Sequence, residues 1–246
     1  MRVVGVIPSR YGSTRFPGKP LARIGGKPLL QWVIEGVKTS SKITDILVAT
    51  DHNEIFELAK SLGALAVMTD SELPSGSDRV WQAVKNRDVD VVVNIQGDEP
   101  TVNGEILDLL VSCFERDEDL PMATLARPIK NKEDLESLAT AKIVVDKDQN
   151  AIYFSRYPIP FSRNSKDAVS QLGLKHIGLY AYRKSFLKQF CECEPAGVEI
   201  AEGLEQLRAL YLGAKIKVLK VDHESWGVDY PEDIEKVEAI LRKGNS

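Results

Sequence analysis

VDVVVNIQGDEP, residues 89–100, is the stretch that decides the fold. Its centre, Val91–Ile95, is apolar at four of five successive positions. A strand of this kind is buried on both faces, as in the middle of a parallel sheet. A glycine and two carboxylates follow at once, where the carboxyl end of such a strand meets the ligand-binding edge of an open α/β sheet.

Strands and helices alternate on the N-terminal side of this stretch. The pattern predicts four strands, at Val3–Ile7, Ile43–Thr50, Ala64–Met68 and Val89–Ile95. It predicts three helices between them, at Pro28–Thr39, Asn53–Leu62 and Ser77–Lys85. Strands that alternate with helices of this length indicate βαβ units. We therefore expect an α/β fold with a mainly parallel, doubly wound, Rossmann-like sheet.

The regular alternation of strands and helices ends after Pro121. Further strands are predicted at Met122–Arg127, Lys142–Asp146, Ala151–Phe154, His176–Tyr182 and Lys215–Val221. Helices are predicted at Gly197–Leu212 and Pro231–Arg242, and a long loop at Tyr157–Leu172. No linker or repeat interrupts the chain. We expect one domain over residues 1–246, with a nucleotide-binding part at roughly 1–120 and a smaller elaborated lobe at roughly 121–225.

Composition narrows the class of protein. The chain has 246 residues, is 43% hydrophobic and carries a net charge of −4. A nucleic-acid partner would usually leave a basic excess, so none is expected. Three cysteines, Cys113, Cys191 and Cys193, make no disulfide framework. With neither a signal-peptide pattern nor an apolar run long enough to span a bilayer, the expected location is the cytoplasm, away from the membrane.

The loop after the first strand reads IPSRYGSTRFPGKP, residues 7–20. Three cations, Arg10, Arg15 and Lys19, stand beside two glycines and the adjacent hydroxyls of Ser13 and Thr14, which suits a triphosphate. The loop is not a Walker A motif, because its glycines are one residue too far apart and Pro20 replaces the hydroxyl that holds magnesium. The alternative is a surface loop that happens to be basic.

Two aspartates are candidate metal ligands. Asp98 follows the buried strand directly, and Asp229 follows a glycine in WGVDYPED, residues 226–233. Mg²⁺ favours one or two carboxylates together with phosphate oxygens and water. The alternatives are a simple Gly-Asp turn at residue 98 and a helix N-cap at residue 229.

Several motifs occur together in a fixed order. They are PSRYGSTRFPGKP, ATD, SGSDR, NIQGDEP, YFSR, HIGLYAY, EQLR and GVDYPED. In this combination, from Val3 to about Val237, the chain resembles the 3-deoxy-manno-octulosonate (Kdo) cytidylyltransferases, also called CMP-Kdo synthetases. The resemblance implies a nucleotidyltransferase-type fold that joins CTP and the sugar acid Kdo to give CMP-Kdo and pyrophosphate for lipopolysaccharide synthesis. It also implies Mg²⁺ as cofactor and a homodimer, whose dimer contacts and sugar site lie in the smaller lobe.

The resemblance implies roles for individual residues. Lys19, Asp98 and Asp229 would be catalytic, the two aspartates as metal ligands. The CTP site would consist of Ser9, Arg10, Arg15, Lys19, Ser77, Arg79 and Gln96. The sugar acid would contact Arg156, His176, Tyr180, Glu205 and Gln206. Two departures from the family pattern are Ser9, where alanine is usual, and a shorter, more polar segment at Phe161–Lys175.

Other interpretations stay open from the residues alone. His176 could be an ordinary strand histidine, and Glu205 with Arg208 an exposed helix pair. The substrate could be 8-amino-Kdo or sialic acid, and the chain could be a nucleotide sensor without catalysis. A glycosyltransferase would need a DxD motif after a strand, and Asp88-Val89-Asp90 precedes one instead.

Overall fold

The computed structural model describes residues 1–161, 163 and 173–244. Most of the loop predicted at Tyr157–Leu172 lies outside them. Contacts within the chain define two compact units, Met1–Val111 with Glu224–Ser246, and Ser112–His223. We call them unit 1 and unit 2 and describe each by itself.

Unit 1 is built on a parallel sheet. Its strands are β1 (Val3–Ser9), β4 (Asp45–Thr50), β5 (Leu65–Met68) and β6 (Val91–Asn94). They run in the order β6-β1-β4-β5, and every neighbouring pair is parallel. The strands β1 and β6 are almost wholly buried, as the two-sided apolar pattern predicted. The predicted α/β fold class, with a mostly parallel doubly wound sheet, is confirmed.

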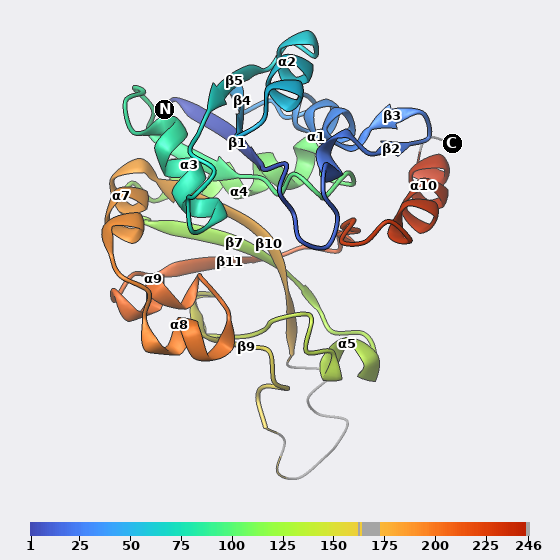
Figure 1. Ribbon diagram of the computed structural model, residues 1–246. Coiled ribbons are helices and arrows are strands. Elements are labelled where there is room, and N and C mark those ends of the chain that lie inside the picture. Colours follow the sequence, from blue (N-terminus) through green and yellow to red (C-terminus); the bar gives the residue numbers. More distant parts are fainter. Residues whose placement is uncertain (162, 164–172, 245–246) are drawn as a thin grey trace. The chain divides into compact units, whose positions relative to one another are not determined.

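Five of the described helices belong wholly or in part to unit 1. They are α1 (Leu29–Val37), α2 (Asn53–Ser61), α3 (Gly76–Val84), α4 (Gly104–Arg116) and α10 (Asp233–Gly244). A 3₁₀ turn, η1 (Lys19–Leu21), precedes a small hairpin of β2 (Arg23–Ile24) and β3 (Lys27–Pro28). Figure 1 shows α3 in front of the sheet, where it packs on β1, β4 and β6.

The C-terminal helix α10 belongs to unit 1 although it lies far away in sequence. Val237 on α10 is buried in an apolar cluster with Ile24, Leu29 and Val228. Phe16, from the basic loop, packs against the same cluster. The basic loop and the segment that carries Asp229 are therefore anchored in one small core.

Two helix boundaries differ from the sequence prediction. The final helix begins at Asp233 rather than Pro231, and the Asp233 carboxylate accepts the backbone N–H groups of Asp229 and Tyr230. Asp229 therefore lies before the helix and is not its N-cap. Helix α4 was missed, although Asn103 caps it by accepting the Ile106 N–H.

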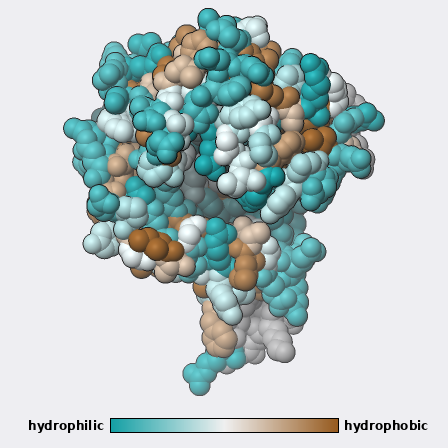
Figure 2. Space-filling model, in the orientation of Figure 1, coloured by the Kyte–Doolittle hydropathy of each residue, from teal (hydrophilic) through white to brown (hydrophobic). Residues whose placement is uncertain are grey.

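Unit 2 contains a mixed sheet. Its strands are β7 (Met122–Pro128), β8 (Lys142–Val145), β9 (Ala151–Ser155), β10 (Leu174–Arg183) and β11 (Ile216–Lys220). β11 runs parallel to β7, and the pairs β7–β10, β10–β8 and β8–β9 are antiparallel. Its helices are α5 (Lys132–Glu136), α7 (Lys184–Glu192), α8 (Gly197–Glu202) and α9 (Leu207–Tyr211). Figure 2 shows a small hydrophobic patch over α8, where Ile200 is exposed.

The single helix predicted at Gly197–Leu212 is wrong. It is two short helices, α8 and α9, because Gly203 adopts the left-handed conformation with φ 61° and ends α8. Arg208 is also not on the surface as the helix-pair interpretation assumed. It is buried, and its guanidinium binds both carboxylate oxygens of Glu199, at 2.6 and 2.9 Å. The break leaves Glu205 and Gln206 in the turn between the helices.

Candidate functional site

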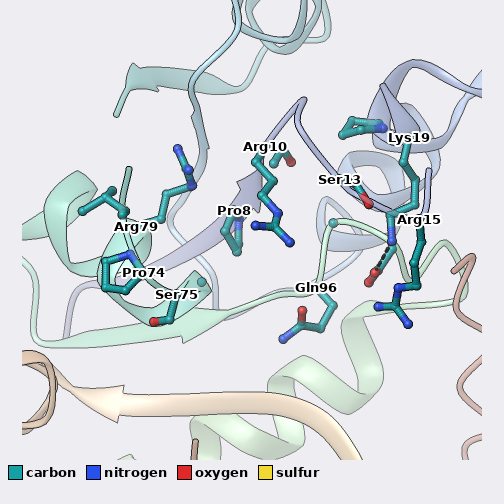
Figure 3. A pocket seen from close by; sticks show the side chains of 15 residues that line it. Pro8, Arg10, Ser13, Arg15, Lys19, Pro74, Ser75, Arg79 and Gln96 are labelled. Carbon is teal, nitrogen blue, oxygen red and sulfur yellow. Dashed lines mark hydrogen bonds and ion pairs between the residues drawn. The ribbon is translucent and has the colours of Figure 1, made fainter. Parts of the chain in front are cut away.

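A cavity of about 260 Å³ opens in unit 1 at the carboxyl ends of β1 and β6. Figure 3 shows the side chains of Arg10, Arg15 and Lys19 pointing to the same side of the basic loop. The lining consists of Pro8, Ser9, Arg10, Ser13, Arg15, Lys19, Pro20, Leu73, Pro74, Ser75, Gly76, Arg79, Gln96, Gly97 and Asp98. Four cations and one carboxylate in one cavity make it suited to a polyanionic ligand.

Backbone hydrogen bonds fix the shape of the basic loop. The Tyr11 carbonyl accepts the N–H groups of Ser13 and Gly18, both at 2.9 Å. Gly18 closes the loop with φ 69°, a conformation that glycine adopts without strain. The Tyr11 N–H donates to Asp51 at 3.0 Å, and the Tyr11 ring stacks on His52 with centroids 4.0 Å apart. The loop is thus tied to the end of β4.

Most of the cations in the cavity are already paired. Lys19 Nζ lies 2.6 Å from Asp98 Oδ2 and 4.0 Å from Asp229 Oδ1. Arg15 Nη2 lies 2.9 Å from Asp229 Oδ1. Arg79 is buried and pairs with Asp51 at 3.2 Å. Among the described residues, Arg10 finds no carboxylate within ion-pair distance, so its charge is available to a ligand.

The opposite wall is the start of α3. Ser75 caps this helix by accepting the Asp78 N–H, and Ser75 and Gly76 both line the cavity. The N-terminal end of a helix offers backbone N–H groups and partial positive charge to an anion. Ser77, expected in the CTP site, is buried and does not line the cavity.

The floor is formed by close approach of two backbones. A Cβ on Gly97 would lie 2.9 Å from the Pro8 carbonyl oxygen and 3.0 Å from Ser9 Oγ. Contacts this short force the neighbours to move. Only glycine at residue 97 therefore lets the Gln96–Asp98 turn lie against the end of β1.

Asp98 and Asp229 lie side by side because their backbones are joined. The Val228 N–H donates to the Asp98 carbonyl at 2.9 Å, and the Trp226 N–H donates to Thr101 Oγ1 at 3.2 Å. Both carboxylates face the same ammonium group, that of Lys19. Two converging carboxylates fit Mg²⁺, which takes the rest of its ligands from phosphate and water. The described residues contain no cluster of three or more His, Cys, Asp or Glu side chains that could hold a metal alone.

Glu99, next to Asp98, is an unusual carboxyl group. It is buried, and its Oε1 has no hydrogen-bond partner among the described residues. Burial, and then the neighbouring charge of Asp98, raise the pKa of Glu99 to about 7. The group is therefore uncharged over a much wider pH range than an ordinary glutamate.

In unit 2 the structure brings His176 and Tyr180 together on β10. Their ring centroids are 5.2 Å apart, across a register shift in the β7–β10 pairing. Thr124 Oγ1 donates to the Leu179 carbonyl at 2.8 Å and lies 3.0 Å from His176 Nε2. Thr124 thus holds the His176 ring through Nε2, and the other ring nitrogen is left for a ligand. Burial lowers the pKa of His176 to about 3, so the ring is neutral.

Glu205 and Gln206 belong to the same region of unit 2. Burial raises the pKa of the Tyr180 hydroxyl. The negative charge of Glu205, which lies near Tyr180, raises this pKa further. Gln206 is buried, and its Nε2 has no hydrogen-bond partner among the described residues. Such a donor is costly unless a ligand or water accepts from it.

Arg156 is already used by the protein. Its Nε and Nη2 donate to the carbonyls of Glu202 and Gly203, at 2.8 and 3.0 Å. Its Nη1 donates to the carbonyls of Leu138 and Ala139 at 3.0 and 3.3 Å. These four bonds engage four of the five N–H groups of the guanidinium. Arg156 therefore holds the turn that precedes Glu205, with one N–H left over.

The chain is similar to known proteins. The family model for cytidylyltransferases matches residues 4–216. A 3-deoxy-manno-octulosonate cytidylyltransferase of Bdellovibrio bacteriovorus is 56% identical, over 98% of either chain. The chain belongs to the 3-deoxy-manno-octulosonate cytidylyltransferase family. The enzyme of that name from Thermodesulfovibrio yellowstonii is 42% identical, again over 98% of either chain.

A solved structure of this family supports the same grouping. It is a CMP:2-keto-3-deoxy-manno-octonic acid synthetase complexed with CTP, with a TM-score of 0.93 and 38% identity. The match covers 99% of this chain and 100% of that one. In addition, no described helix is both long and apolar enough to cross a membrane.

Sequence reasoning missed several residues that shape these sites. Ser13, Pro74 and Ser75 line the cavity, and Thr124 contacts Nε2 of His176. The sequence does carry a signal for Ser75, since SGSD, residues 75–78, is a helix-start pattern. Nothing in the sequence marks Thr124, because its partner lies on another strand.

Proposed function

We propose that this chain transfers CMP from CTP to Kdo and releases pyrophosphate. The observation that carries the proposal is the cavity of unit 1, which is lined by three loop cations, the start of α3 and Asp98, with Asp229 paired to two of the same cations, Arg15 and Lys19. It is supported by family membership and by the likeness to a synthetase complexed with CTP.

The nucleotide would bind in the cavity of unit 1. Arg10, Arg15 and Lys19 would contact the triphosphate, with Ser9, Arg79 and Gln96 around the rest of CTP. Ser75 and Gly76 take the place in this wall that we first expected of Ser77. Ser77, which is buried behind this wall, would contribute to the CTP site without contacting the nucleotide.

In the proposed reaction the anomeric hydroxyl of Kdo attacks the α-phosphorus of CTP. The new oxygen–phosphorus bond forms as the bond to the bridging oxygen breaks, pyrophosphate leaves, and the hydroxyl proton passes to solvent. Negative charge accumulates on the departing pyrophosphate. Cations fixed in advance at that position lower the barrier without having to reorganise. Lys19 and Arg15 would do this.

Asp98 and Asp229 would hold Mg²⁺. When bound, the ion neutralises phosphate oxygens and lowers the pKa of a hydroxyl that it ligates. We assign no side chain as the base, so the hydroxyl proton passes to solvent.

The sugar acid would bind to unit 2 through His176, Tyr180, Glu205 and Gln206. The neutral His176 offers its second ring nitrogen, and Gln206 offers a donor that has no partner among the described residues. A site built on hydrogen bonds rejects analogues that leave its polar atoms unpaired. Arg156 would contribute through its remaining N–H and by holding the turn before Glu205.

The test is pyrophosphate release with a panel of CTP, UTP and ATP against Kdo, 8-amino-Kdo, sialic acid and a neutral sugar. We expect the highest kcat/KM for CTP with Kdo, and a phosphodiester product detectable by ³¹P NMR. Binding of CTP without turnover on any sugar would mark a sensor instead. Turnover confined to sialic acid or 8-amino-Kdo would correct the substrate.

We further propose a homodimer, supported by the family resemblance. Light scattering should give twice the mass of one chain. A monomer that is fully active would remove this part of the proposal.

A further inference from the structure

The cations expected to bind the triphosphate are held by the carboxylates expected to bind the metal. Lys19 lies 2.6 Å from Asp98, and Arg15 lies 2.9 Å from Asp229. Lys19 is also within 4.0 Å of Asp229. Only Arg10, of the three loop cations in the described chain, lacks such a partner.

We infer that, without a metal, Asp98 and Asp229 hold Lys19 and Arg15 in ion pairs that compete with CTP, and we call these pairs the lock. A divalent cation that binds the two carboxylates frees both cations for the triphosphate. This inference rests on the proposed function, because it concerns CTP and the proposed metal ligands. It goes beyond it by assigning the carboxylates an inhibitory role toward CTP when the metal is absent.

The physical reason is competition for the same charges. Without a metal, the triphosphate must displace carboxylates from Lys19 and Arg15 and then lie beside two uncompensated negative groups. With a metal, the carboxylates have a partner and both cations turn to phosphate. The coupling must be reciprocal, so CTP also raises the affinity for the metal.

The two ion pairs should not contribute equally. The side chains of Lys19 and Asp98 are 13% and 33% exposed, whereas those of Arg15 and Asp229 are 55% and 51% exposed. Solvent screening leaves little energy in an exposed pair. The Lys19–Asp98 pair is therefore the main lock, and Arg10, which has no carboxylate partner among the described residues, should allow some CTP binding without metal.

The test measures equilibrium binding of CTP by calorimetry in EDTA and in saturating Mg²⁺. In EDTA we expect Asp98→Asn to bind CTP about tenfold more tightly than the wild type, since one charge beside the phosphates is removed. We expect a smaller gain for Asp229→Asn. In Mg²⁺ the order reverses, because the same variant has lost a metal ligand.

Two controls identify the cause. Asp45→Asn changes the net charge equally, but Asp45 pairs with Arg2 at the start of β4, away from the cavity. It should leave CTP binding unchanged in both conditions. In Asp98→Asn combined with Lys19→Met, the gain in EDTA should disappear, because no locked cation remains to be released.

The outcomes separate the lock from the proposed function. The lock is overturned if the wild type binds and turns over CTP but folded Asp98→Asn binds it no more tightly in EDTA. It is also overturned if Asp45→Asn shows the same gain. Wild-type protein that binds no CTP even with Mg²⁺ would overturn both proposals at once.

Discussion

The buried carboxyl of Glu99 should make unit 1 less stable as the pH rises. Burial, and then the charge of Asp98, raise its pKa from the ordinary value of 4.5 to about 7. A carboxyl whose pKa is higher in the folded chain binds its proton more tightly there. Its stabilising contribution is present below pH 4.5 and is lost as the pH rises to about 7. Glu99→Gln removes this dependence and keeps the shape of the side chain.

The size of the effect follows from the shift. At about 1.4 kcal/mol per pKa unit, the penalty carried by wild-type Glu99 is about 1 kcal/mol at pH 5 and about 3 kcal/mol at pH 8. The free energy of unfolding of Glu99→Gln, relative to that of the wild type, should therefore rise by about 2 to 3 kcal/mol from about pH 5 to about pH 8. For a chain of this size that is a relative rise in Tm of about 5 to 10 °C.

The assay is thermal unfolding in EDTA at pH 5 and pH 8, followed by tryptophan fluorescence. All three tryptophans, Trp32, Trp81 and Trp226, belong to unit 1, so the signal reports on the unit that contains Glu99. Glu105→Gln is the matched control, because Glu105 is exposed on α4. Equal Tm differences at the two pH values would refute the reasoning.

Three further predictions follow from individual contacts. Gly97→Ala should raise the Kd for CTP by about tenfold or more with little change in sugar KM, since its Cβ would meet the Pro8 carbonyl at 2.9 Å; unchanged Kd by calorimetry would contradict the close-approach argument. His176→Ala should raise the sugar KM or lower kcat with CTP affinity nearly unchanged, because only unit 2 loses a group; a kinetic defect confined to CTP would count against the sugar assignment. Arg208→Met should lower the free energy of unfolding by about 3 to 5 kcal/mol, because it leaves Glu199 buried without its partner. Calorimetric unfolding measures this loss, and the double variant with Glu199→Met should recover much of it. An Arg208→Met variant as stable as the wild type would refute the argument.

The sheet of unit 1 was predictable because its signal is local. Val91–Ile95 is apolar on both faces, and β1 and β4 alternate with helices whose length suits a parallel crossover. Asp98 and Lys19 could be named for the same reason, since Asp98 and the loop that carries Lys19 each follow a strand at the binding edge. Their ion pair could not, because it joins residues that are distant in sequence.

The errors have physical causes. Gly203 lies inside an apolar pattern of helical period, and only its left-handed conformation in the folded chain ends α8. The burial of Arg208 depends on Glu199, which meets it through that break. The use of Arg156 to hold backbone carbonyls is equally tertiary, since its partners lie near residues 138 and 203.

The central claim is that unit 1 carries out a transfer reaction that uses CTP and depends on the Asp98 carboxylate. Its most direct test is the rate of pyrophosphate release from CTP and Kdo at saturating Mg²⁺, for wild type and Asp98→Asn side by side. Asp222→Asn, in an exposed pair with Lys130, is the control, and thermal melting verifies that all three are folded. We expect release by the wild type and the control, and a rate at least about 100-fold lower for Asp98→Asn, as the loss of a metal ligand implies. An Asp98→Asn rate within about tenfold of the wild type, or a folded wild type that releases no pyrophosphate with Kdo, would contradict the claim.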